Sequence, residues 1–199
     1  QIVWKADKNE WINNLKRRVE EAANVRWYET LGRGPGKGAV IVYLSGLGVV
    51  DDNGRACLLM PGKPDSEAVF DPEQRIPMRD IFHELFYDRD AERERLPRDV
   101  LKFVILDAGR ADQSWELGLP YNAFVEGLRD TVQNDLPVSN LFVLNAADNG
   151  QMAWPSPELG GTVFGHFVRR GLQGHADGYA AGSTVRDRDR FVTVAELFE

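Results

Sequence analysis

The segment 102–112, KFVILDAGRAD, constrains the fold of this chain more than any other stretch. Its four consecutive apolar residues, 103–106, form a run that is too short for a buried helix and is typical of a buried strand. Asp107, Gly109 and Arg110 follow the run. Because ligands bind at the carboxyl ends of the strands in open α/β sheets, the segment predicts a strand that ends at a functional site.

A second apolar run, Ala39–Ser45, predicts another strand that ends in the same manner. It leads directly into Gly46-Leu47-Gly48, where two glycines allow the backbone to turn sharply and to approach a ligand closely. We therefore expect the loop after this strand to approach whatever lies above the sheet.

The rest of the chain predicts alternating helices and strands. Capping boxes at 7–10 and 193–196 each mark the start of a helix, and Asn53-Gly54 is a strong hairpin signal. Apolar spacing predicts further helices after Pro77, over 121–128 and over 163–168, the last ending near Gly171 and Gly174, and a third buried strand over 141–144. This order implies α/β layers around a mainly parallel sheet, but the pattern alone does not give the strand order.

One charged segment and two single residues are interpreted as structural. The segment 88–99 mixes arginines and acids, which is typical of a solvated loop that contributes little to stability. Cys57 follows the predicted hairpin turn and is interpreted as a small packed hydrophobe. His83 lies beside an apolar helical stripe, which favours solvent exposure or packing over catalysis.

Composition excludes several classes of protein. The 199 residues, 43% of them hydrophobic, suffice for one sizeable core, so a single domain over residues 1–199 is expected. No apolar run approaches the ~20 residues of a membrane span, and a net charge of −7 argues against nucleic acid as a partner. The single cysteine excludes an internal disulfide and favours a reducing compartment such as the cytoplasm.

The two strand ends resemble motifs of the caspase-like cysteine peptidases, the family of caspases, metacaspases and their bacterial relatives. There, one strand ends in Ser-Gly-His-Gly with the catalytic histidine, and another ends in Asp-Ala-Cys-Arg with the nucleophile. This chain has Ser45-Gly46-Leu47-Gly48 and Asp107-Ala108-Gly109-Arg110. The two variant positions are 109 − 47 = 62 residues apart, compared with roughly 50 between histidine and cysteine in caspases.

The resemblance covers nearly the whole chain and implies the caspase-like (caspase-hemoglobinase) layered α/β fold, a mainly parallel sheet flanked by helices. The family's N-terminal strand and helix have no counterpart before residue 7. Both ends of the sequence therefore look like boundaries inside a longer, multidomain chain.

The chemistry implied by the resemblance is incomplete. Leu47 cannot transfer a proton, Gly109 has no side chain, and the loss of a nucleophile costs on the order of 10⁶ in turnover in comparable serine enzymes. We therefore expect a pseudopeptidase with a binding, regulatory or scaffolding role. The backbone N–H groups of Gly48 and Gly109 correspond to the family's oxyanion hole, which neither substitution removes.

The resemblance also implies a partner. Asp107 corresponds to an acidic pocket that accepts Arg or Lys in metacaspase-type members, with Ser45 and Arg110 beside it, so we expect a protein or peptide with a basic anchor. Alternatively, Asp107 caps local backbone amides or pairs with Arg110. No cofactor and no metal are expected, and the oligomeric state stays open.

Three alternatives remain open. The first is an active hydrolase with a displaced nucleophile, Cys57, Ser45 or Ser114, and His166 or His175 as the base. The second is an engineered inactive peptidase. The third is a small-molecule or nucleotide-binding domain, although neither a GxGxxG motif nor a P-loop is present.

Trp154, in a predicted loop, either faces a ligand or caps the core.

Overall fold

The computed structural model describes residues 8–24, 38–60, 74–88, 91–108, 123–149, 151–178, 189 and 192–198. The chain divides into two compact units, Gln1–Met152 and Ala153–Glu199. The N-terminal residues 1–7, the glycine-rich segment 32–37 and the charged segment 186–188 lie outside the described residues.

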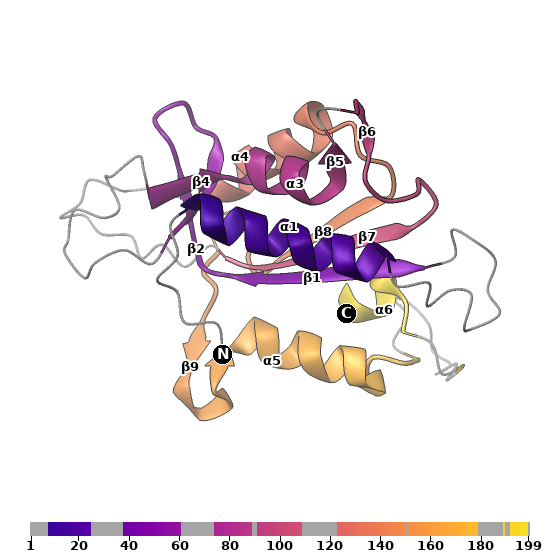
Figure 1. Cartoon of the computed structure of the whole chain (residues 1–199). Helices are drawn as coiled ribbons and strands as arrows, with labels where there is room; N and C mark the ends of the chain where they lie inside the picture. Colours follow the sequence, from indigo (N-terminus) through magenta and orange to yellow (C-terminus); the bar gives the residue numbers. More distant parts are fainter. Residues whose placement is uncertain are drawn as a thin grey trace. The chain divides into compact units, whose positions relative to one another are not determined.

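The first unit contains a parallel sheet, which among the described residues has three strands in the order β1-β7-β8 (Figure 1). The strands are β1 Ala39–Ser45, β7 Leu101–Asp107 and β8 Leu141–Asn145. The central strand β7 is buried almost throughout, because it has a neighbour on each side and its apolar run faces both ways. The prediction of a third buried strand is wrong for Phe142, which is 48% exposed because β8 has a described neighbour on one side.

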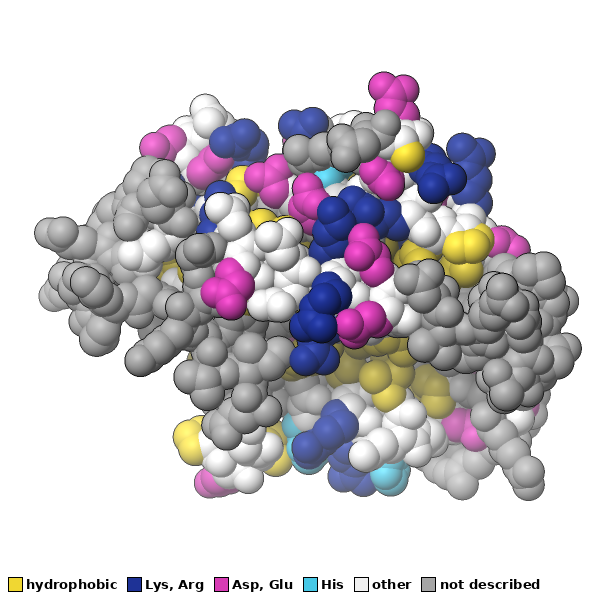
Figure 2. Space-filling view, in the orientation of Figure 1, with side chains coloured by type: hydrophobic (Ala, Val, Ile, Leu, Met, Phe, Trp, Pro, Cys, Tyr) yellow, Lys and Arg dark blue, Asp and Glu magenta, His cyan; other side chains and the backbone are white. Residues whose placement is uncertain are grey.

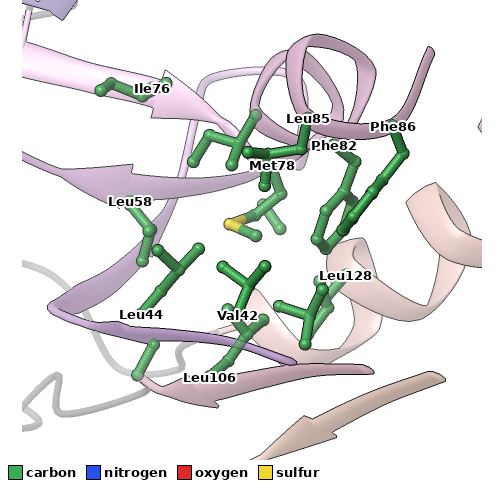
Figure 3. Close-up of a cluster of buried hydrophobic side chains, with 14 of the residues drawn as sticks. Val42, Leu44, Leu58, Ile76, Met78, Phe82, Leu85, Phe86, Leu106 and Leu128 are labelled. Carbon is green, nitrogen blue, oxygen red and sulfur yellow. The ribbon is translucent and has the colours of Figure 1, made fainter. Parts of the chain in front are cut away.

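Three helices pack against one face of this sheet. They are α1 Lys8–Asn24, α3 Met78–Phe86 and α4 Phe124–Asp130. Figure 3 shows side chains of α3 converging with Val42, Leu44 and Leu106 of the sheet. Phe82 is fully buried in this cluster, and replacing such a phenylalanine by alanine typically costs about 3–5 kcal/mol. Trp11 and Val19 of α1 are buried in the same cluster, and residue 7 of the predicted capping box lies outside the described residues.

An antiparallel sheet of three short strands follows β1. Its strands are β2 Leu47–Val50, β3 Ala56–Leu59 and β4 Arg75–Pro77, in the order β2-β3-β4. The predicted hairpin is confirmed: Gly54 has φ 76°, and the Asp51 carboxylate accepts hydrogen bonds from the N–H groups of Asn53 and Arg55, both at 2.9 Å. Strand β4 was not predicted, because a strand of three residues that ends at a proline is too short to show the alternation of a strand.

Helix α4 approaches the hairpin turn closely enough to require a glycine. A Cβ atom on Gly127 would lie 2.6 Å from the carbonyl oxygen of Gly54 and 2.8 Å from the nitrogen of Ala56. Backbone atoms cannot move aside as a flexible side chain can, so any larger residue at position 127 would displace the helix from the turn.

The segment 88–99 differs from its prediction. It forms a two-stranded antiparallel ribbon with the preceding residue, β5 Tyr87–Asp88 paired with β6 Arg93–Glu94. The Glu94 side chain is 8% exposed and lies 3.0 Å from the Nζ atom of the fully buried Lys102. The expectation of a solvated loop with little contribution to stability is therefore wrong at Glu94, because the loop closes over the beginning of β7.

The Lys102 ammonium group is surrounded by oxygen atoms. Besides pairing with Glu94, it donates hydrogen bonds to the carbonyl oxygens of Ser139 (2.8 Å), Pro97 (3.2 Å) and Val100 (3.4 Å). The Ser139 hydroxyl in turn donates to Glu94 at 2.7 Å. This network ties the loop before β7 to the turn before β8.

The second unit is mostly helical. Its elements are β9 Pro155–Ser156, the 3₁₀ turn η4 Pro157–Leu159, β10 Gly161–Thr162, α5 Val163–Arg170, the π-helical turn η5 Gly171–His175 and α6 Val194–Phe198. The predicted helix over 163–168 is confirmed, with Thr162 as its cap. The capping box at 193–196 is confirmed as well: the Thr193 hydroxyl accepts from the Glu196 N–H at 3.2 Å, and the Glu196 carboxylate accepts from the Thr193 N–H at 2.8 Å.

Charged side chains of both signs intermingle over helix α1 in Figure 2. The exposed pair Arg17 and Glu21, one turn apart on this helix, is an example at 3.1 Å. Within the described part of the chain, none of the helices has the length and apolar character needed to cross a membrane.

Candidate functional site

The two strand ends singled out in the sequence lie side by side. Strands β1 and β7 are parallel and adjacent, and Ser45 is the register partner of Asp107. One residue later, the Gly46 N–H donates a hydrogen bond to the carbonyl oxygen of Asp107 at 3.2 Å. The loops that leave the two strands therefore begin next to each other at the carboxyl edge of the sheet.

The loop after β1 carries an apolar side chain at position 47. Leu47 is half-buried and opens strand β2, where its register partner is Leu59 of β3. Gly48 follows it, is buried, and pairs with Leu58. The corresponding positions on the second loop, Gly109 and Arg110, lie outside the described residues. The predicted roles of Leu47, Gly48, Gly109 and Arg110 thus stay predictions.

Asp107 is buried but is held by a residue at the surface. Its side chain is 1% exposed, and its Oδ2 atom accepts a hydrogen bond of 2.6 Å from the hydroxyl of Tyr43. Tyr43 belongs to the neighbouring strand and is 48% exposed. This bond comes from a distant side chain, and Arg110 lies outside the described residues, so the alternative that Asp107 caps local backbone amides or pairs with Arg110 stays a prediction.

Tyr43 was not singled out in the sequence, yet a signal was present. Alternate residues of a strand point to the same face, so Tyr43 and Ser45 share a face of β1. Because Ser45 is in register with Asp107, that face also carries the Asp107 side chain. The alternation of side chains along β1 indicates which face of the sheet Tyr43 occupies. It does not indicate which strand lies beside β1, so the pairing of β1 with β7 was the missing information.

Cys57 does not have the properties of a nucleophile. Its thiol is fully buried and donates a weak hydrogen bond to the carbonyl oxygen of Arg55 at 3.5 Å. Burial raises the pKa of this thiol to about 11, so the reactive thiolate is scarce at neutral pH. The interpretation of Cys57 as a packed hydrophobe is confirmed.

Ser45 and Ser114 are the other candidates for the displaced nucleophile. Ser114 lies outside the described residues, and Ser45 is exposed at the end of β1. His83 is buried on α3, with its ring edge-on to Tyr87 at 5.5 Å, which confirms a packing role.

Two histidines and one tryptophan belong to the second unit. His166 is half-buried on α5, and His175 is exposed at the end of η5. Trp154 is 64% exposed, so its interpretation as a cap over the core is wrong, whereas a ligand-facing role stays a prediction. Among the described side chains, no group of three or more His, Cys, Asp or Glu is arranged to hold a metal ion.

A cavity of about 690 Å³ lies elsewhere in the first unit. It is lined by residues 19–20, Asp88 and the segment 92–98, which carry both acids and arginines. None of the residues predicted for the site lines it. Comparisons with protein-family models, with curated proteins and with solved structures gave no match.

Proposed function

We propose that this chain is a caspase-like domain that has lost the catalytic dyad and acts as a pseudopeptidase, with a binding, regulatory or scaffolding role. The observation that carries the proposal is the register of β1 and β7, which brings Ser45 beside Asp107 at one edge of the sheet. The motif resemblance requires this neighbourhood, because histidine and cysteine must meet at the two strand ends in an active member of the family.

The residues at these positions support loss of catalysis. Cysteine peptidases need a thiolate to attack the carbonyl and an imidazole to pair with it and to protonate the leaving amine. Leu47 supplies an apolar group where the family motif has histidine, and Gly109 supplies no side chain where it has cysteine. The high pKa of the buried Cys57 thiol argues against it as a replacement nucleophile.

The binding role is proposed to use the carboxyl edge of the sheet. Asp107 would provide the negative charge for a basic side chain of a bound protein or peptide. Leu47 would make the neighbouring surface more apolar than a histidine does. The buried Gly48 and the residue Gly109 would retain the backbone amides of a carbonyl-binding notch.

The test is peptide hydrolysis by the unmodified chain beside the double variant Leu47→His/Gly109→Cys. Fluorogenic peptides with Arg, Lys or Asp before the scissile bond serve as substrates. We expect no turnover by the unmodified chain and measurable turnover by the double variant, with basic peptides preferred. The single variant Gly109→Cys is the matched control, since it adds a thiol without the imidazole.

Either of two results would contradict the proposal. Turnover by the unmodified chain that scales with its concentration would mean that a displaced nucleophile is active, and the variant Cys57→Ala would then show whether the thiol is responsible. A double variant that is folded but silent on every peptide would mean that the edge of the sheet is not a peptidase cleft.

A further inference from the structure

Tyr43 occupies a distinctive place in the candidate site. Its ring is half-exposed, whereas the Asp107 carboxylate that accepts a hydrogen bond from its hydroxyl is almost completely buried. A ligand that approaches this face of the sheet therefore meets the tyrosine before it meets the carboxylate. Ser45, which shares the same face, is also exposed, so the face is open at the end of β1.

The hydrogen bond between the two residues is short. At 2.6 Å it lies in the range of O–H···O⁻ bonds, which are roughly twice as strong as bonds between neutral groups. A carboxylate is an acceptor only, and the groups that it best accommodates are N–H and O–H donors. The phenol and a basic ligand side chain are thus both donors to the same carboxylate.

We propose that Tyr43 determines the specificity of the site by competing with the ligand for Asp107. In the ligand-free chain its hydroxyl holds the carboxylate, and a bound basic side chain replaces that hydroxyl. The displaced ring then offers its face to the cation, and a planar guanidinium stacks on it better than a compact ammonium does. This inference rests on the proposed basic anchor at Asp107, and it predicts a preference for Arg over Lys.

The test uses fluorescein-labelled peptides that differ at one position, where Arg, Lys or Ala stands between alanines. Binding to the full chain is measured by fluorescence anisotropy. We expect the variant Tyr43→Phe to bind the Arg peptide about tenfold more tightly than the unmodified chain, because the competing donor is gone and the ring is retained. The affinity for the Ala peptide should not change.

Two further variants complete the design. Tyr43→Leu removes the ring together with the hydroxyl, so it should lose the preference for Arg over Lys while keeping a preference for both over Ala. Tyr87→Phe removes a hydroxyl from another half-buried tyrosine of the same unit and should behave as the unmodified chain. Thermal unfolding of each variant verifies that it is folded.

The outcomes separate the two ideas. If Asp107→Asn abolishes binding of the Arg peptide but Tyr43→Phe binds it equally well or less tightly, the competing role of Tyr43 is overturned and the basic anchor stands. If the Arg peptide binds no more tightly than the Ala peptide to the unmodified chain and to Tyr43→Phe, the basic anchor itself fails, and this inference fails with it.

Discussion

Strand β7 carries a buried charged residue near each end, and the two ends are built in opposite ways. Lys102, near the beginning, is surrounded by a buried carboxylate and backbone carbonyl oxygens. Asp107, at the end, is held by the hydroxyl of a half-exposed tyrosine on the adjacent strand. The first arrangement shields the charge from solvent, and the second has a half-exposed donor between the charge and the surface. Two charged residues that are equally buried on one strand therefore differ in the exposure of their partners.

The largest effect on stability is expected at Lys102, near the beginning of β7. The variant Lys102→Ala removes the buried cation beside Glu94 and leaves only the exposed Arg98 guanidinium, 3.7 Å away, and breaking a buried pair in this way costs about 3–5 kcal/mol. Urea denaturation of the full chain measures the loss. Lys16→Ala is the matched control, because the Lys16–Glu84 pair spans 3.7 Å and is about a third exposed, so that about 0–1 kcal/mol is expected. Equal losses in the two variants would remove the structural role of Lys102.

A smaller effect on stability is expected at the end of β7, where Tyr43 donates to Asp107. Removal of the Tyr43 hydroxyl in Tyr43→Phe deletes one hydrogen bond to a carboxylate, which is worth about 1.5–3 kcal/mol. In a double-mutant cycle with Asp107→Ala, the two changes should not add, because each of them removes the same bond. Additive losses in urea denaturation would mean that the two side chains do not interact in solution.

Acid should weaken the ion pair between Lys102 and Glu94. Burial alone would raise the pKa of Glu94, but the hydrogen bond from Ser139 and the pairing with Lys102 outweigh burial and leave the pKa below its usual 4.5. Since the pKa is lower in the folded chain, this carboxylate stabilises the fold at neutral pH, and the contribution is lost as the pH falls below about 4.5. Glu94→Gln should flatten the stability profile in that range. An unchanged profile would show that other carboxylates cause the acid sensitivity.

The smallest effect concerns the thiol of Cys57, which lies on β3 and at neither end of β7. Burial raises its pKa to about 11, so a disulfide reagent at pH 8 should leave the native chain unmodified and label it once in urea. The chain has a single cysteine, so the labelling stoichiometry reports on this residue directly. Rapid labelling of the native chain would restore Cys57 as a candidate nucleophile.

Much of the first unit was predictable, because its signals are local. The bounds of β1 and the burial of β7 follow from short apolar runs, and the Asn53-Gly54 turn follows from residues that tolerate positive φ. The prediction was wrong for Glu94, because a charge-rich segment resembles a solvated loop unless its partner is known. Lys102 lies eight residues further along, inside what is otherwise an apolar strand, and nothing local connects the two.

The sequence by itself determined the residues that stand at the two strand ends, including Leu47 and Gly109, together with the caps and turns around them. These features depend on neighbours within a few positions along the chain, so they can be read without a fold. Only the tertiary structure decided that β1 lies beside β7 and that Tyr43 reaches Asp107, which is 64 residues away. The alternation of a strand indicates the face that a side chain occupies, but the neighbour across the sheet is chosen by the packing of the whole unit.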